Sequence, residues 1–237
     1  SGEPGSSTYI RIRGANTIQS SQQPLIVIDG SPIDNSTFGN SLGRYGAGQG
    51  ATSTNRAMDI NTNDIKSVEV LKGPASRIFG QNAYAGAINI ITELSDQKNL
   101  RVQGYAGDFG MKGLNFAGSL PSGKYKQNLS ISYDDSNGHW YNSDYQVSNI
   151  FYEGGLDLND HHSLRGMIAY TDRSFGANGF YTSAFPDQWE SLQTTLGALS
   201  HTYTQNRFKL NSRAYWRRNK DEYRLRRNEP SFYQNFH

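Results

Sequence analysis

The sequence has no cysteine among its 237 residues, which excludes structural disulfides and thiolate metal sites. It also lacks any run of about 18 apolar residues, so no transmembrane helix is expected. Membrane barrels remain compatible with this absence, because their strands alternate apolar and polar residues. The opening SGEPGSSTYIRIRG shows no signal peptide, but a secreted protein would already have lost one.

The residues that are abundant indicate a β protein. Only 35% of the chain is hydrophobic and the mean hydropathy is −0.71, a combination that would indicate disorder if the net charge were high. The net charge is only +2, however, and 12% of the residues are aromatic. With 25 Gly, 15 Tyr and 11 Phe, the composition favours a glycine- and tyrosine-rich β protein.

The first 98 residues form one compositional block. Strands are predicted at Tyr9–Arg13, Leu25–Asp29, Val68–Leu71 and Ala87–Ile91, and the continuous apolar run of the second indicates a strand buried on both faces. The stretch between Gly30 and Met58 is rich in Gly, Asn and Ser and predicts a long functional or mobile loop.

From Leu100 onward the hydrophobic pattern has a period of two, typical of strands with two different faces. In the last predicted strand, Leu210 and Trp216 share one face, whereas Arg213 and Arg217 share the other. Many of these segments are as long as a tilted membrane strand, about 9–11 residues. The predicted strands are 100–109, 112–120, 125–134, 146–158, 163–173, 190–204 and 207–221.

The connections between these strands alternate in length. Residues 121–124, 159–162 and 204–206 form short connections, whereas 135–145 and 174–189 form long ones. Outer-membrane barrels have this asymmetry between their two ends. An open sheet with one apolar face would aggregate in water and would leave unpaired backbone groups in lipid. We therefore interpret the chain as part of a larger barrel.

Two segments carry a family resemblance: IRIRGANTIQSSQQPLIVIDGSPID (residues 10–34) and VEVLKGPASRIFGQNAYAGAINIIT (Val68–Thr92). Together they resemble the plug domain of TonB-dependent outer-membrane transporters. The first segment is most similar to the SusC/RagA branch, which imports glycans or peptides under a surface lipoprotein lid. The hairpins that follow are more similar to cobalamin and ferric-siderophore receptors.

The resemblance implies a mostly β fold, with a small α/β plug domain followed by the first antiparallel strands of a transmembrane β-barrel. The plug would occupy residues 1–98, with its first part missing, and about seven barrel strands would occupy residues 99–237. In the family the plug fills a barrel of 22 strands. About fifteen strands would then lie beyond His237, and the TonB box would lie before Ser1.

The function implied by the resemblance is TonB-dependent, energy-coupled uptake of a scarce nutrient such as cobalamin, a ferric siderophore or a glycan. It would take place in the outer membrane of a Gram-negative bacterium. The implied partners are the TonB inner-membrane energy-transducing complex, outer-membrane lipid, the small nutrient ligand and a surface lipoprotein. No enzyme activity and no resident cofactor are expected.

The residues alone leave two other functions open. A soluble β-rich surface protein for binding or adhesion would pack the apolar strand faces together in water. A carbohydrate-active enzyme would need a pair of carboxylates in a cleft, for which Asp134, Asp135, Asp144 and Glu153 are candidates. No nucleophile–base arrangement is visible.

Arg13 and Lys72 match positions where the family carries basic plug residues that pair with barrel carboxylates. We call this predicted contact the plug–barrel lock. Lysine at position 72 lacks the bidentate geometry of the more usual arginine. The predicted ligand-facing residues of the plug apex are Asn35, Arg44, Tyr45 and Gln49.

Aromatic residues concentrate in the two long connections, where they would form a membrane-interface girdle or contact a ligand. The predicted extracellular-loop ligand contacts are Trp140, Tyr141, Phe175, Phe180, Tyr181 and Trp189. Asp134, Asp135 and Asp144 cluster around the first long connection and are weak calcium candidates, the alternative being a solvated polar turn.

Three further patterns are given ordinary structural interpretations. GAGQGA (residues 46–51) matches a dinucleotide fingerprint but has neither the preceding strand nor the following helix. His161 and His162 are adjacent and cannot share one face, so zinc is not expected without other ligands nearby. Residues 207–229 contain nine Lys/Arg and three Asp/Glu, but the inward basic face suits a barrel lumen, and nucleic acid is not expected as a partner.

Overall fold

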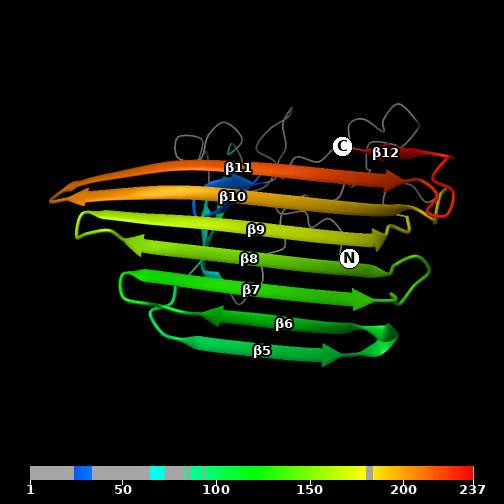
Figure 1. Ribbon diagram of the computed structural model, residues 1–237. Helices are drawn as coiled ribbons and strands as arrows, with labels where there is room; N and C mark the ends of the chain where they lie inside the picture. The colour runs from blue at the N-terminus through cyan, green and yellow to red at the C-terminus, as the bar shows by residue number, and fades with distance from the viewer. Residues whose placement is uncertain are drawn as a thin grey trace.

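The computed structural model describes residues 24–33, 65–72, 83, 86–92, 94–179 and 184–236, which form two separate β-sheets. Figure 1 shows the strands of the larger sheet side by side in chain order. The smaller sheet has the order β2-β1-β4-β3. Its strands are β1 (Leu25–Ile28), β2 (Ser31–Ile33), β3 (Ile65–Leu71) and β4 (Ala87–Thr92).

A two-residue turn joins β1 and β2. Asp29 and Gly30 both have positive φ, 46° and 76°, as expected for the Asp-Gly turn that suits a tight hairpin. β1 also pairs in parallel with β4, which pairs antiparallel with β3. Leu25, Val27 and Ile28 are each at most 3% exposed, so the prediction of a buried strand from this apolar run is confirmed.

The larger sheet is an antiparallel meander in which each strand pairs with the next. All seven predicted strands are present, with ends that differ by up to three residues, and a short β12 that was not predicted pairs with the end of β11. In the described part of the chain, no helix has the length and apolar character needed to cross a membrane. The strands are β5 (Asn99–Ala106), β6 (Lys112–Ser119), β7 (Tyr125–Ser136), β8 (Tyr145–Asp157), β9 (His162–Gly176), β10 (Trp189–Gln205), β11 (Phe208–Arg224) and β12 (Gln234–Phe236).

The connections of the larger sheet are sorted by end, as predicted. The turns 120–124, 158–161 and 206–207 lie at one end, and the longer loops 137–144, 177–188 and 225–233 lie at the other (Figure 1). A further connection, 107–111, lies at the long-loop end, and its first three residues, 107–109, were predicted as strand. It turns because Phe109 and Gly110 have positive φ, 57° and 67°.

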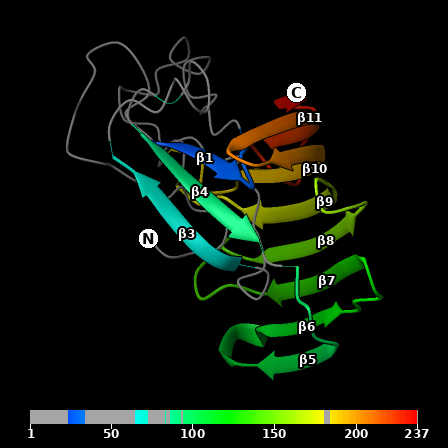
Figure 2. The ribbon, with the colours of Figure 1, turned by 90° about the vertical axis from the view of Figure 1, so that its left-hand side faces the viewer.

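The two faces of the larger sheet differ sharply. On β9, Ile168 points outward and is 60% exposed, whereas its neighbours Met167 and Ala169 are 6% and 2% exposed. Leu199 of β10 is likewise outward and 57% exposed. Figure 2 shows the sheet curved, with the smaller sheet against its inner face. The predicted alternation is therefore real: the outer face is apolar and uncovered, and the inner face receives the smaller sheet.

Candidate functional site at the contact between the two sheets

The contact between the sheets is centred on Ile28, the last residue of β1. Its side chain is fully buried in a cluster with residues of three neighbouring strands of the larger sheet. These residues are Phe151 of β8, Met167 and Ala169 of β9, and Leu196 of β10. A fully buried aliphatic side chain contributes about 1.5–3 kcal/mol. The smaller sheet is thus held to the inner face partly by this one apolar contact.

A polar contact lies beside the apolar one. The Thr92 hydroxyl, at the end of β4, lies 2.6 Å from Oδ2 of Asp29 and 2.8 Å from Oε2 of Glu153 on β8. The Thr92 amide also donates to Oδ1 of Asp29 at 3.0 Å. Because a hydroxyl carries one proton, it can donate to only one carboxylate at a time. One threonine therefore bridges two acidic groups from different sheets.

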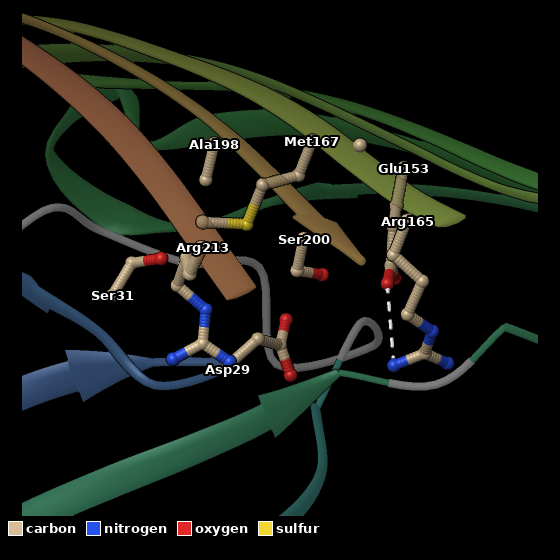
Figure 3. Close-up of a pocket in the computed structure, with 9 residues that line it drawn as sticks. Asp29, Ser31, Glu153, Arg165, Met167, Ala198, Ser200 and Arg213 are labelled. Atoms are coloured by element: carbon tan, nitrogen blue, oxygen red, sulfur yellow. Dashed lines mark ion pairs between the residues drawn. The ribbon is translucent and has the colours of Figure 1, made fainter. Parts of the chain in front are cut away.

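Charge around this bridge comes from both sheets. Glu153 is 2% exposed, and its Oε1 lies 3.7 Å from Nη1 of Arg165 on the neighbouring strand β9. Figure 3 shows this pair, with the guanidinium of Arg213 from β11 next to Asp29. The groups line a small cavity of about 20 Å³, enough for a single water molecule. Charged groups from both sheets therefore meet around one small cavity.

Gly30 meets the large sheet directly. Its φ of 76° lies in the region that favours glycine, and a Cβ there would collide with the guanidinium of Arg213. Its amide donates to Oδ1 of Asn89 at 3.2 Å, and the Asn89 amide donates to Glu69 at the same distance. The backbone conformation therefore favours glycine at this turn, whereas the Arg213 guanidinium is the end of a long side chain that a Cβ could displace.

Gly30→Ala is expected to lower the free energy of unfolding by about 1–2 kcal/mol from the left-handed conformation alone. Displacement of Arg213 from its position over the turn would add to this. Urea titration would measure the change. Gly197→Ala is the control, since no atom lies within 4 Å of the position its Cβ would take. Equal effects of the two substitutions would show that close approach at Gly30 is unimportant.

The structure places only part of the predicted plug–barrel lock. Arg13 lies outside the described residues, and Lys72 is exposed just after β3, so its role stays a prediction. The contact that is present instead uses Glu153, Thr92 and Asp29. Sequence reasoning considered Glu153 only as a catalytic candidate. The missed signal was its register: it lies between Tyr152 and Gly154 on one strand, so its side chain points to the opposite face from theirs, which is the inner one.

The predicted ligand contacts are spread over strands and loops. Trp140 and Tyr141 lie in the loop 137–144 and are 69% and 63% exposed. Phe175 and Trp189 were predicted in a loop, but they lie in β9 and β10 because these strands extend further than the pattern indicated. Phe175 is 2% exposed and packs with Ala177 and Leu192, so its environment is that of a core residue.

Several predicted site residues cannot be placed. Phe180 and Tyr181, as well as the apex residues Asn35, Arg44, Tyr45 and Gln49, lie outside the described residues. Trp189 is partly buried, and the guanidinium of Arg224 lies 4.7 Å from the centre of its ring.

The calcium candidates do not converge. Asp134 and Asp135 are neighbours on β7 and therefore point to opposite faces of the sheet. Asp135 pairs with Lys112 at 3.4 Å, and Asp144 pairs with Arg227 at 2.6 Å. Within the described ranges, no three His, Cys, Asp or Glu residues are placed to bind one metal ion.

Hydrogen bonds join the loops at the long-loop end. The Asn142 amide donates to the Pro186 carbonyl at 2.8 Å and to the Gln188 carbonyl at 2.6 Å. Arg227 donates through its backbone to the Asp187 carbonyl, also at 2.8 Å, as well as through its side chain to Asp144. Trp140 and Tyr141 are therefore presented on a loop that is braced by its two neighbours.

The phenol of Tyr141 donates to Asp187 in the adjacent loop, and this hydrogen bond raises the pKa of Tyr141 above its ordinary value. The contact is therefore present below about pH 10 and is lost as the pH rises through the higher pKa of the folded state. We expect the ultraviolet titration difference between wild type and Tyr141→Phe to show an ionisation above pH 10. Asp187→Asn should move the midpoint of this ionisation back toward pH 10. An unchanged midpoint would show that the hydrogen bond to Asp187 does not raise the pKa of Tyr141.

Comparison with known proteins gives a consistent result. Residues 1–87 match the family model of the TonB-dependent Receptor Plug Domain. The chain is 40% identical over 93 residues to the TonB-dependent receptor SusC of Bacteroides thetaiotaomicron, an alignment covering 39% of this chain and 8% of that protein. It is 33% identical over 118 residues to the vitamin B12 transporter BtuB of Vibrio vulnificus, covering 49% of this chain and 16% of that protein.

Solved structures show the same fold. The siderophore receptor PiuA of Acinetobacter baumannii superposes with a TM-score of 0.64 at 14% identity, over 84% of this chain and 29% of that one. The yersiniabactin receptor FyuA of Yersinia pestis gives 0.62 at 19%, over 84% and 32%. The chain thus spans about a third of these structures and under a fifth of the curated relatives above. Residues 1–87 thus match the plug-domain family, and the chain has the fold seen in these solved receptors.

Proposed function

We propose that the complete protein takes up a scarce nutrient across the outer membrane of a Gram-negative bacterium. The plug, assigned to residues 1–98, closes the barrel, whose first part is assigned to residues 99–237. Coupling to the TonB complex of the inner membrane displaces the plug and opens a path. The protein performs no covalent chemistry on its cargo.

One observation carries this proposal: the larger sheet has an apolar outer face and holds the smaller sheet on its inner face. An outward stripe that includes Leu114, Ile131, Ile150, Ile168 and Leu199 is 43–60% exposed. Such a face suits lipid, because in water it would be an aggregation site. The inner contact through Ile28 and Glu153 suits a plug that must be held but also released.

The substitution Ile168→Arg separates this proposal from a soluble binding or adhesion protein. In a membrane barrel, an arginine on the lipid face at mid-depth costs about 2–4 kcal/mol, so the variant should be depleted from the outer-membrane fraction. Ser174→Arg, on the same outer face of β9 but near the long loops, should insert normally. Soluble, correctly folded Ile168→Arg protein without detergent would overturn the proposal.

The cargo class is proposed from the relatives and from the exposed loop aromatics. The names of BtuB and of the siderophore receptors point to vitamin B12 or ferric siderophores, and the sequence resemblance to the SusC/RagA branch adds glycans. Trp140 and Tyr141 could stack on a planar or sugar ligand. A thermal-shift panel with oligosaccharides, cobalamin and ferric siderophores tests this, since a ligand at 100 times its Kd stabilises by about 2.7 kcal/mol. The shift should be lost in Trp140→Ala.

A surface lipoprotein partner is proposed only for the SusC-like case. Co-purification from outer membranes solubilised in mild detergent would detect it. If the panel selects a siderophore or cobalamin and no second protein copurifies, the lipoprotein is withdrawn without affecting the transport proposal.

A further inference from the structure

Two histidines that are 39 residues apart in the sequence meet on the outer face of the larger sheet. His162 begins β9 and His201 lies near the end of β10. Nδ1 of His162 is 2.9 Å from Nε2 of His201. The rings are stacked, with centres 5.1 Å apart and planes inclined by 16°.

The strand register brings the two rings together. β9 and β10 are antiparallel, with Tyr203 opposite His162 and Leu164 opposite His201, so the histidines are diagonal neighbours on one face. The ring of Tyr203 lies 4.7 Å from that of His162 and limits its rotation. His161 takes no part, because its Nδ1 lies 2.9 Å from the Thr204 carbonyl oxygen.

This pairing removes the reason for which zinc was not expected from the sequence. His161 and His162 cannot share one face, but His201 supplies the second imidazole from the next strand. One of the two facing nitrogens must carry the shared proton and the other must accept it. A metal ion can take the place of that proton, since neutral imidazole binds Zn²⁺, Cu²⁺ and Ni²⁺ through the same lone pair.

We propose that His162 and His201 form a two-histidine site for a divalent transition-metal ion. With Zn–N bonds of about 2.0–2.1 Å, tetrahedral geometry places two nitrogen ligands about 3.3 Å apart. The observed 2.9 Å would have to open by about 0.4 Å, and the rings would have to turn so that both lone pairs meet at the ion. The parts of the chain that the structure describes place no third His, Cys, Asp or Glu at this site, so water completes the shell.

A bound ion would join β9 to β10 at the short-turn end of the sheet. Because it binds the folded pair and not the separated strands, it would raise the thermal midpoint with concentration. The order of affinity expected for such a site is Cu²⁺ above both Ni²⁺ and Zn²⁺. This proposal does not rest on the transport function, since the pair is defined by the sheet alone.

Isothermal titration of the complete protein tests the site, using detergent-solubilised material without a histidine tag after removal of metals by a chelator. The probes are Cu²⁺, Ni²⁺ and Zn²⁺ as simple salts. His162→Ala and His201→Ala should each remove one binding event or weaken it at least about tenfold, since loss of even an outer-shell partner costs 10–100-fold. His161→Ala and His139→Ala are the matched controls and should bind as wild type does.

A spectroscopic measurement keeps the test decisive if a variant folds poorly. Electron paramagnetic resonance of the Cu²⁺-loaded wild-type protein should show two nitrogen ligands. The absence of any binding that depends on both His162 and His201 would overturn the proposal. So would a Cu²⁺ spectrum without paired nitrogen ligands, which would leave the contact as a stacked hydrogen-bonded pair.

Discussion

Thr92→Val is expected to loosen the plug from the barrel wall. Valine has nearly the same shape but its side chain cannot donate a hydrogen bond, so the hydroxyl between Asp29 and Glu153 would be lost while the backbone amide of residue 92 still donates to Asp29. Glu153 is almost fully buried and cannot turn to solvent. A hydrogen bond to a charged group contributes about 1.5–3 kcal/mol, and this is the contribution that valine removes.

The measurement is the urea concentration at which the complete protein begins to conduct in a planar bilayer, because under the proposed function conduction requires the plug to leave the wall. Thr92→Val should lower it, whereas Thr92→Ser keeps the hydroxyl and should resemble wild type. Glu153→Gln in the Thr92→Val background removes one of the facing charges and should restore part of the loss. If the two substitutions add without any coupling, the bridge is not a single unit.

Glu153→Gln alone is the informative counterpart. It removes the charge but keeps an oxygen that can accept from the Thr92 hydroxyl. Its pair with Arg165 is weakened by water, because that arginine side chain is 45% exposed. We therefore expect Glu153→Gln to have a smaller effect than Thr92→Val, which distinguishes a hydrogen-bond bridge from a simple ion pair.

Local patterns in the sequence were enough to predict the larger sheet. Alternation over residues such as 163–173 fixes which side chains share a face, and connection lengths fix which loops share an end. The strand ends were less accurate. β9 runs on to Gly176 and β10 begins at Trp189, because pairing with neighbouring strands continues through residues that no longer alternate clearly.

The contacts that form the site could not be predicted in the same way. Glu153 meets Thr92 across 61 positions, and His162 meets His201 across 39. Each pair depends on the register between strands or on how one sheet docks on another, neither of which leaves a local pattern. The basic residue Lys72 matched a family position, yet the contact visible here is made by an acidic residue of the wall and a threonine.

Ile28→Ala should weaken plug docking by about 2–5 kcal/mol, the range for truncating a fully buried aliphatic side chain. Ile28 is 0% exposed, and its cluster partners Phe151, Met167 and Leu196 all belong to the barrel wall. The cavity would therefore open at the interface between the two sheets. The conductance assay in urea should show earlier opening, with the barrel itself unfolding as in wild type.

Leu25→Ala is the matched control, because Leu25 is also buried but packs within the plug against Val27, Ala83 and Ala87. It should destabilise the plug sheet without removing the contact with the wall. The double mutant Ile28→Ala with Met167→Ala should lose less than the sum of the single losses, since the two side chains share one cluster. Leu25→Ala combined with Met167→Ala should be additive. Additivity in both pairs would show that Ile28 stabilises the plug sheet itself and not its contact with the wall. The apolar part of the docking contact would then have to be made by other residues.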